Sequence, residues 1–285
     1  DKPWLKYYDK ALTEEDIPKC SAFRMLYERN KDYLTDTALL YFHRKITYQE
    51  LFSKIRNAAG KLKSIGIKEG DIITFQTLNM PQMVILFYAC SYIGAIANIM
   101  YVTAENKELH EELCKTESVL YVTLNALWEK RKEALTGTSV KNVLLLSVGE
   151  EADPVTKNVI KWKERKLKDN SKGILYWSQI NCAISGALPE VNNGELPVAM
   201  IYTSGTTGKS KAVILTNRML NALVMQYQKA GISLKRGDVF MDSIPQFVAF
   251  GLVFAMHMPL CLGLINTIIL DPTPMNAGKY FVKYK

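Results

Sequence analysis

Apolar residues recur along this chain with two spacings, one typical of helices and one typical of buried strands. Between Thr47 and Gly66 they return every three or four positions among mostly polar neighbours. Thr47 and Glu50 have the spacing of a capping box, and glycine is favoured just after a helix. The pattern therefore predicts an amphipathic helix that ends at Gly66. Its apolar positions are Leu51, Ile55, Ala58, Leu62 and Ile65.

The next segment contains continuous apolar runs, which predict a strand, a helix and a second strand. Residues 72–78 and 97–102 are typical of buried strands, and residues 81–93, which start with proline, are typical of a helix. Parallel strands need a long crossover, usually a helix. We therefore predict that the two strands are neighbours in a parallel sheet.

The rest of the chain continues this alternation, except that residues 149–193 give no clear pattern. Further helices are expected at residues 21–30, 106–114, 217–230 and 247–258. Further strands are expected at residues 39–42, 45–47, 118–123, 143–148, 196–202, 212–216, 238–245 and 265–270. Such an alternation predicts an α/β fold with mostly parallel sheets flanked by helices.

Composition and charge indicate a globular protein and give no support for nucleic-acid binding. A chain of 285 residues with 48% hydrophobic content is long enough to bury a sizeable core. The net charge of +8 is spread over the length, with one dense basic patch at residues 157–172. We interpret that patch first as a solvated helix face or loop, and an anion-binding site is the alternative interpretation. Without a recognisable module for it, nucleic-acid binding is not expected.

Cysteine spacing and the N-terminal sequence indicate a reducing compartment. The five cysteines are far apart and form no C-x-x-C pair. The first residues lack the apolar core of a secretion signal, so we expect a cytoplasmic protein. Two uncharged stretches, residues 72–104 and 243–270, are divided by prolines and polar residues. They therefore favour buried α/β elements over membrane spans.

A segment rich in hydroxyls, glycines and lysines follows the expected strand 196–202, and reads Thr203-Ser-Gly-Thr-Thr-Gly-Lys-Ser-Lys211. Gly205 and Gly208 permit backbone conformations in which successive N–H groups turn toward one anion. The remaining donors are the hydroxyls of Thr203, Ser204, Thr206 and Thr207 and the amines of Lys209 and Lys211. This segment, the phosphate segment below, therefore predicts a polyphosphate-binding loop between two strands.

The Walker loop of strand-loop-helix nucleotidases is the first comparison for such a segment. Its tail matches Gly208, Lys209 and Ser210, but Thr203 stands where that pattern has its first glycine. A Walker helix also begins directly behind the lysine, whereas strand-like residues follow here. We reject the Walker interpretation for these two reasons.

The phosphate segment closely resembles the signature Y-T-S-G-T-T-G-x-P-K-G of the acyl-adenylate-forming synthetases, which include acyl-CoA synthetases. Residues 202–211 match at every defined position but one, where Ser210 replaces proline, and Ala212 then replaces glycine. Residues 46–51 and 66–81 resemble the family's entry helix and its following turn, strand and N-x-P corner. The resemblance covers nearly the whole chain. Within the family, the chain most resembles an acyl-CoA synthetase of the fatty-acid–CoA ligase type.

Membership would imply a large N-terminal adenylation domain with two α/β lobes. The lobes carried over from the family are residues 71–233 and residues 1–70 plus 234–285. The family's later motifs and its small C-terminal domain, which bears a catalytic lysine, do not occur here. We therefore expect this chain to be the N-terminal part of a longer protein, inactive by itself.

The resemblance also implies the chemistry. A carboxylic acid, commonly a fatty acid, would react with ATP and Mg²⁺ to give an acyl-adenylate, and coenzyme A would then take the acyl group. Lys211, at the family's lysine position, is the expected catalytic residue, and Lys209 occupies a variable position. The expected nucleotide-binding residues are Thr203, Ser204, Gly205, Thr206, Thr207, Gly208 and Lys211. The oligomeric state and any direct metal ligands are left open.

Some positions depart from the family pattern, so alternatives stay open. Val248 stands where the family usually has a histidine. Phe247, Phe250 and Phe254 either line an acyl tunnel or belong to the core, because their spacing fits both. An aryl-acid ligase, an amino-acid adenylating enzyme and a non-catalytic nucleotide-binding or acyl-binding relative remain as alternatives. The histidines of the chain, His43, His110 and His257, are scattered and expected to be structural or exposed.

Overall fold

Six parallel strands and one antiparallel edge strand form the larger sheet of the computed structural model. The structure describes residues 12–180, 188–203 and 211–270 and the single residues 3, 6, 186, 278 and 282. Across this sheet the strand order is β7-β6-β5-β3-β4-β8-β9. The strands are β3 (Ile72–Gln76), β4 (Ile96–Ile99), β5 (Leu120–Leu124), β6 (Asn142–Leu146), β7 (Ile174–Tyr176), β8 (Pro197–Thr203) and β9 (Lys211–Thr216). The predicted parallel pairing of the first two is confirmed, with Ile73 opposite Ala97.

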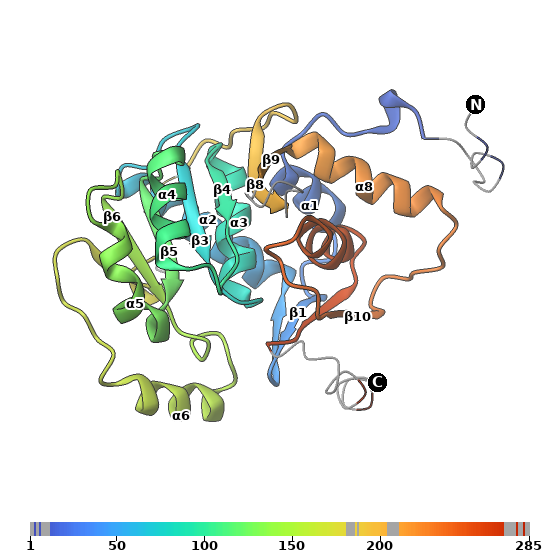
Figure 1. The fold of residues 1–285 in the computed structure, drawn as a ribbon. Coiled ribbons are helices and arrows are strands. Elements are labelled where there is room, and N and C mark those ends of the chain that lie inside the picture. Colours follow the sequence, from blue (N-terminus) through green and yellow to red (C-terminus); the bar gives the residue numbers. More distant parts are fainter. Residues whose placement is uncertain are drawn as a thin grey trace.

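A second sheet brings together residues from both ends of the chain (Figure 1). Its order is β10-β11-β1-β2, in which β1 pairs with β11 in parallel and with β2 in antiparallel. The strands are β1 (Thr37–Tyr41), β2 (Arg44–Thr47), β10 (Val239–Asp242) and β11 (Ile265–Ile268). The N-terminal hairpin thus adds two strands to a C-terminal parallel pair.

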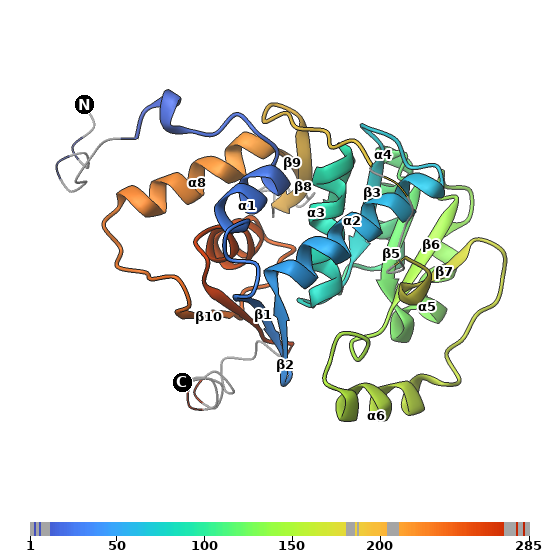
Figure 2. The same cartoon turned by 180° about the vertical axis from the view of Figure 1, so that it is seen from behind.

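Helices cover both faces of the larger sheet, as the opposite views of Figures 1 and 2 show. One face packs on α2 (Tyr48–Ser64), α3 (Pro81–Ile93) and α7 (Trp177–Ile180), and the other on α4 (Asn106–Thr116) and α5 (Asn125–Arg131). The strands are apolar on both faces: Leu144 faces the α3 side and Leu145 the α4 side. This is the pattern expected for a parallel sheet between helical layers.

The central helix α3 is buried on every side, because it lies beneath the sheet and also packs against α1 (Ala22–Asn30) and α2. All 13 of its residues are buried, which agrees with its uninterrupted apolar sequence. Pro81 occupies its first turn, and Gly94 ends it with φ of 75°. The sequence predicted these bounds because proline is favoured in the first turn of a helix and glycine just after its last turn.

Residues 149–193, which gave no sequence pattern, contain α6 (Pro154–Glu164), β7 and α7. The helix α6 lies at the lower edge of the molecule in both views, outside the layers that cover the sheet. It contributes no fully buried residue. Its N-cap stabilises it, because the Asp153 carboxylate accepts hydrogen bonds from the N–H groups of Val155 and Thr156.

The helix expected at residues 247–258 differs from the prediction. After α8 (Asn217–Lys229) and β10, the chain forms a π-helix, Gly251–His257, followed by the short helix α9 (Met258–Cys261). In a regular α-helix the Ala255 carbonyl would accept from residue 259, but Pro259 has no N–H. The Asn266 side chain donates to that carbonyl instead, at 3.1 Å. The remaining helical turns, Glu14–Asp16 and Lys132–Leu135, are of the 3-10 type.

None of the helices within the described ranges is long and apolar enough to cross a membrane. The four cysteines that the structure describes, Cys20, Cys90, Cys114 and Cys261, carry free thiols. Cys182 lies outside the described residues.

Candidate functional site

The two ends of the phosphate segment meet at the edge of the larger sheet. Thr203 is the last residue of β8, and Lys211 is the first residue of the antiparallel strand β9. The two residues are cross-strand partners, and the Thr203 hydroxyl lies 3.5 Å from the Lys211 carbonyl oxygen. Both residues are exposed. The structure therefore confirms the two strands that sequence analysis predicted on either side of the segment.

The remaining site predictions fall outside the described residues. This applies to Ser204, Gly205, Thr206, Thr207 and Gly208, and also to Lys209 and Ser210. Their roles in binding a nucleotide stay predictions. Thr203 lies at the carboxyl end of a parallel strand, which is where ligands bind in open α/β sheets.

A chain of buried polar side chains anchors β8 to the rest of the sheet. The Tyr202 hydroxyl lies 2.8 Å from the Asn98 side-chain oxygen and 3.0 Å from a Glu112 carboxylate oxygen. Asn98 donates in turn to the Thr74 hydroxyl, which lies 2.6 Å from the Ser118 hydroxyl. Burial, with a smaller contribution from Glu112, raises the pKa of Tyr202. Tyr202 therefore stays a neutral donor and fixes β8 next to β4.

A second buried polar group joins the carboxyl ends of β3 and β10. The Asn79 amide donates to an Asp242 carboxyl oxygen at 2.9 Å and to the Ile244 carbonyl at 2.8 Å. The Gln246 amide donates to the other Asp242 oxygen at 2.8 Å. Burial raises the pKa of Asp242 to about 8, although the hydrogen bonds from Gln246 and Asn79 act in the opposite direction.

Sequence analysis did not single out Asp242 as a functional candidate. One signal was present, since Asp242 is an acidic residue within an otherwise uncharged apolar run, residues 239–245, that ends at Pro245. Its partner Asn79 lies 163 residues away in the sequence, so a single sequence gives no indication of the contact.

Gly251 is needed because the backbone of Pro245 lies directly against it. A Cβ atom at position 251 would lie 1.9 Å from the Pro245 carbonyl oxygen and 2.9 Å from that of Ile244. Both atoms belong to the backbone, so a side chain could be accommodated only by moving the chain. The segment between Pro245 and Gly251 therefore has a closely packed turn that holds Val248 in a half-buried position.

The three phenylalanines near this turn have different surroundings. The ring of Phe247 lies 4.7 Å from that of Tyr101, measured between centroids. Phe250 is 55% exposed and stacks on Phe254 at 4.4 Å. Phe254 also packs against Phe240 and Tyr227. Phe254 is thus part of an aromatic group at the core margin, and Phe250 covers that group from the solvent side.

The buried histidine has a structural environment. The Nδ1 atom of His257 lies 2.9 Å from the Tyr88 hydroxyl, and its Nε2 atom lies 3.2 Å from the Asn221 side-chain oxygen. Burial lowers the pKa of His257 to about 3, so the ring is neutral at physiological pH. A neutral ring protonated on Nε2 satisfies both contacts, because the tyrosine then donates to Nδ1. The described residues contain no group of three or more His, Cys, Asp or Glu side chains that could hold a metal ion.

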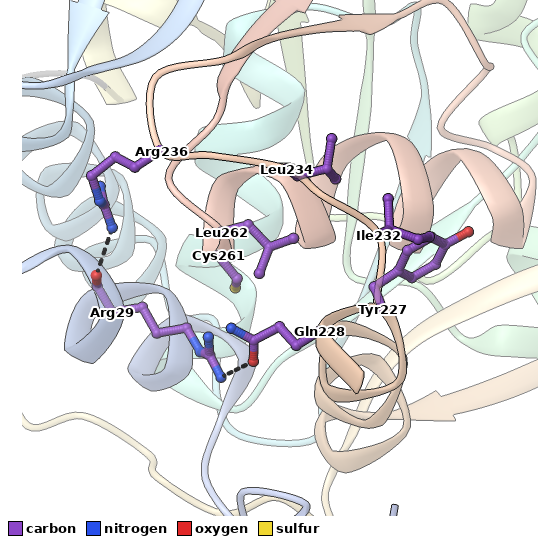
Figure 3. A pocket seen from close by; sticks show the side chains of 8 residues that line it. All are labelled: Arg29, Tyr227, Gln228, Ile232, Leu234, Arg236, Cys261 and Leu262. Atoms are coloured by element: carbon purple, nitrogen blue, oxygen red, sulfur yellow. Dashed lines mark hydrogen bonds between the residues drawn. The ribbon is translucent and has the colours of Figure 1, made fainter. Parts of the chain in front are cut away.

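Among the cavities of the described surface are a smaller and a larger one, and neither of these is lined by Thr203 or Lys211. The smaller, of about 360 Å³, lies among α1, the end of α8, the following loop and α9 (Figure 3). Arg236 donates to the Arg29 carbonyl there, and Arg29 donates to Gln228. This cavity is at the far end of α8 from β9, and a 13-residue helix is about 20 Å long. The larger cavity, of about 750 Å³, lies beneath α6 at the opposite edge of the sheet.

A helix-covered parallel sheet, with a sequence rich in hydroxyls and glycines directly after strand β8, is typical of α/β proteins that bind nucleotides. The family model of the AMP-binding enzymes matches residues 26–284. The chain belongs to this family.

Individual relatives are distant. The chain is 24% identical over 294 residues to a long-chain-fatty-acid–CoA ligase of Bacillus subtilis, covering 100% of this chain and 52% of the relative. It is 23% identical over 298 residues to an acetyl-coenzyme A synthetase of Wolinella succinogenes, covering 98% and 45% respectively. The chain thus spans about half the length of these relatives.

Solved structures share the fold. The crystal structure of the anthranilate CoA ligase AuaEII with anthranoyl-AMP superposes with a TM-score of 0.77 at 17% identity, over 95% of this chain and 49% of the other. A benzoate CoA ligase from Burkholderia xenovorans LB400 gives 0.73 at 17% identity, over 92% and 47%. The prediction of an α/β fold with mostly parallel sheets is confirmed.

Proposed function

We propose that the complete protein is an ATP-dependent acid–thiol ligase that joins a carboxylic acid to coenzyme A. The observation that carries this proposal is the phosphate segment, which follows the acyl-adenylate signature and whose first residue, Thr203, is the last residue of β8. Membership of the AMP-binding enzyme family supports it. The CoA ligases among the relatives support the choice of thiol.

The reaction has two steps. An oxygen of the substrate carboxylate attacks the α-phosphorus of ATP, the bond from that phosphorus to the bridging oxygen breaks, and pyrophosphate leaves. In the second step the sulfur of coenzyme A attacks the acyl carbon, and AMP leaves with the electrons of the carbon–oxygen bond. Mg²⁺, when bound with ATP, would neutralise part of the phosphate charge.

The residues of the phosphate segment would act on the first step. Negative charge increases on the departing pyrophosphate, and N–H groups, hydroxyls and a lysine near it stabilise the transition state. Thr203, Ser204, Thr206 and Thr207 supply hydroxyls, and Gly205 and Gly208 let the backbone approach the phosphates. Lys211 supplies the positive charge, because it stands at the signature's lysine position.

A fatty acid is the proposed substrate. The similarity to the fatty-acid–CoA ligase of Bacillus subtilis supports it, and the partly exposed aromatic group of Phe250 and Phe254 offers an apolar surface. A second candidate is a nucleotide-binding or acyl-binding protein without ligase activity. The substitutions Ser210, Ala212 and Val248 relative to the family pattern favour that candidate.

Acid-dependent exchange of labelled pyrophosphate into ATP separates the candidates. The full-length protein should be tested with ATP, Mg²⁺ and one acid at a time: acetate, medium-chain and long-chain fatty acids, benzoate, anthranilate and amino acids. Exchange stimulated most by a fatty acid supports the proposal. Exchange stimulated only by an aryl acid or an amino acid rejects the substrate but keeps the reaction. ATP binding without exchange for any acid rejects the reaction and favours the binding protein.

A further inference from the structure

The helix α6 exposes an apolar face to solvent. Val155, Val159 and Trp162 are 74%, 49% and 63% exposed. At 100° per residue these positions fall within about 60° of one another, so they form one face. In both views of the molecule α6 lies at the lower edge, outside the helical layers.

The opposite side of α6 holds the helix to the body. Ile160 packs so closely on Gly149 that a Cβ atom at position 149 would lie 2.7 Å from the Ile160 Cβ. Glu164 accepts a hydrogen bond from the Asn125 amide at 3.2 Å. These contacts fix which side of α6 faces inward, so the apolar face is held toward solvent.

Basic residues lie along α6 and the segment that follows it. Lys157, Lys161, Arg165 and Lys168 line the cavity beneath α6, whereas Lys163 and Lys166 are exposed outside that lining. Residues 153–172 contain seven Lys or Arg and three Asp or Glu, a net charge of +4. Among the described residues, the lysines of residues 153–172 form no ion pair within 4.0 Å. The Cζ atom of Arg165 lies over the Trp162 ring, 5.1 Å from its centroid. The basic side chains are those of Lys157, Lys161, Lys163, Arg165, Lys166, Lys168 and Lys172.

We propose that α6 and the basic segment that follows it, residues 153–172, dock on the surface of an anionic lipid membrane. Lipid-interface helices combine an apolar face that often carries tryptophan with a polar face rich in lysine and arginine. The positive charge complements anionic headgroups, and the apolar face is short enough to enter only the headgroup boundary. The proposal is independent of the ligase reaction.

The expected association is weak and reversible. Three apolar side chains bury little surface, so the electrostatic attraction of the lysines has to contribute much of the affinity. Each Lys or Arg close to an anionic surface contributes about 1 kcal/mol, or about fivefold in the partition coefficient, and salt screens the attraction. Vesicles of neutral lipid alone should therefore retain little protein.

The test is co-sedimentation of the full-length protein with vesicles at low ionic strength. One set of vesicles contains phosphatidylcholine alone, and the other contains phosphatidylcholine with phosphatidylglycerol. The apolar variant carries Val159→Glu and Trp162→Glu, and its matched control carries Met219→Glu and Ile232→Glu, at residues that are 56% and 50% exposed. The charge variant carries Lys163→Gln and Lys166→Gln, and its control carries Lys107→Gln and Lys235→Gln at exposed positions.

We expect the unchanged protein to sediment with anionic vesicles only. The apolar variant should not sediment with them, and the charge variant should have a partition coefficient about 25-fold lower. Both controls should bind as the unchanged protein does. Thermal unfolding verifies that the variants are folded. A second readout is quenching of tryptophan fluorescence by brominated phosphatidylglycerol, which should disappear in Trp162→Phe, a variant that keeps the apolar face. Two results would overturn the proposal. One is no binding to anionic vesicles, which is expected if α6 instead contacts another part of the protein or a partner protein. The other is equal binding by the α6 variants and their controls.

Discussion

Lys211 is the residue on which the proposed chemistry depends most directly. It starts β9 opposite Thr203, and its side chain is exposed at the edge where the phosphate segment ends. A lysine that acts on the departing pyrophosphate stabilises the transition state more than bound ATP. We expect Lys211→Ala in the full-length protein to slow pyrophosphate exchange about a hundredfold to a thousandfold, with a much smaller change in the dissociation constant of the acid.

Lys209→Ala is the matched control, since it removes the same charge from a variable position two residues away. This variant should lose far less exchange activity than Lys211→Ala. If Lys209→Ala proved the more damaging, the segment would act as a Walker loop does, and the register assigned to it would be wrong.

Asp242 links stability to pH at the junction of the two sheets. Its pKa of about 8 in the folded protein lies above the ordinary value of about 3.9. Between these values the unfolded chain loses the proton while the folded protein keeps it. The contribution of this group to stability is therefore fully present below about pH 4 and is lost as the pH rises toward 8.

Asp242→Asn should remove this pH dependence. An asparagine cannot ionise, and its amide can donate to the Gln246 side-chain oxygen, which is buried without a hydrogen-bond partner. We expect the thermal midpoint of the variant to change less between pH 5 and pH 8 than that of the unchanged protein. Asp32→Asn at an exposed position is the control. An undiminished fall in the midpoint of Asp242→Asn would show that another group carries the effect.

The β8–β9 hairpin depends on Tyr202 for its position in the sheet. Replacing this residue with phenylalanine keeps the ring but leaves the buried Asn98 oxygen and Glu112 carboxylate without their shared donor. An unsatisfied buried polar group costs about 1–3 kcal/mol. We expect Tyr202→Phe to lower the free energy of unfolding by that amount in denaturant titration, and to reduce pyrophosphate exchange because the phosphate segment is displaced. Tyr33→Phe, at a residue 47% exposed, should change neither property.

Elements with strong local signals could be predicted from the sequence. Helix α3 has the predicted bounds because Pro81 and Gly94 mark its ends, and α2 begins after Thr47, whose side chain accepts from the Glu50 N–H. The other half of the expected capping box differs, since the Glu50 carboxylate bonds to Arg44 from β2. That contact depends on the hairpin packing beside the helix, which no local pattern records.

Elements that depend on distant partners could not be predicted. The π-helix forms where Pro259 removes a donor and Asn266 replaces it. Helix α6 exposes Val155, Val159 and Trp162 to solvent, although an apolar stripe on a helix usually indicates a buried face. For the candidate site, sequence analysis placed the flanking strands correctly but missed the buried groups around Tyr202 and Asp242, because their partners are far apart in the chain.

At the scale of the whole molecule, polar contacts among the described residues connect the two sheets, and two of these contacts involve buried carboxyl groups. One is the contact between Asn79 and Asp242. The other is at Glu151, which is 2% exposed in its side chain and pairs with Arg44 at 2.6 Å and Lys54 at 3.0 Å. Removing a partner of Glu151 leaves a buried charge uncompensated, and removing Asn79 takes a hydrogen-bond donor from the buried Asp242, so both contacts favour one arrangement of the sheets. The division into lobes at residues 71–233 and residues 1–70 plus 234–285 stays a prediction.

The length of the chain leads to the last prediction. Residues 1–285 cover 52% and 45% of the length of two CoA-ligase relatives, so about half of each relative has no counterpart in this chain. Thioester formation requires a site for the thiol as well as for ATP. We therefore expect residues 1–285 alone to form no coenzyme A thioester above background with ATP, Mg²⁺ and fatty acids, in an assay that follows AMP release. The full-length protein under the same conditions is the control, and circular dichroism verifies that the shorter chain is folded. Clear turnover by residues 1–285 would mean that this part of the chain holds every group the reaction needs.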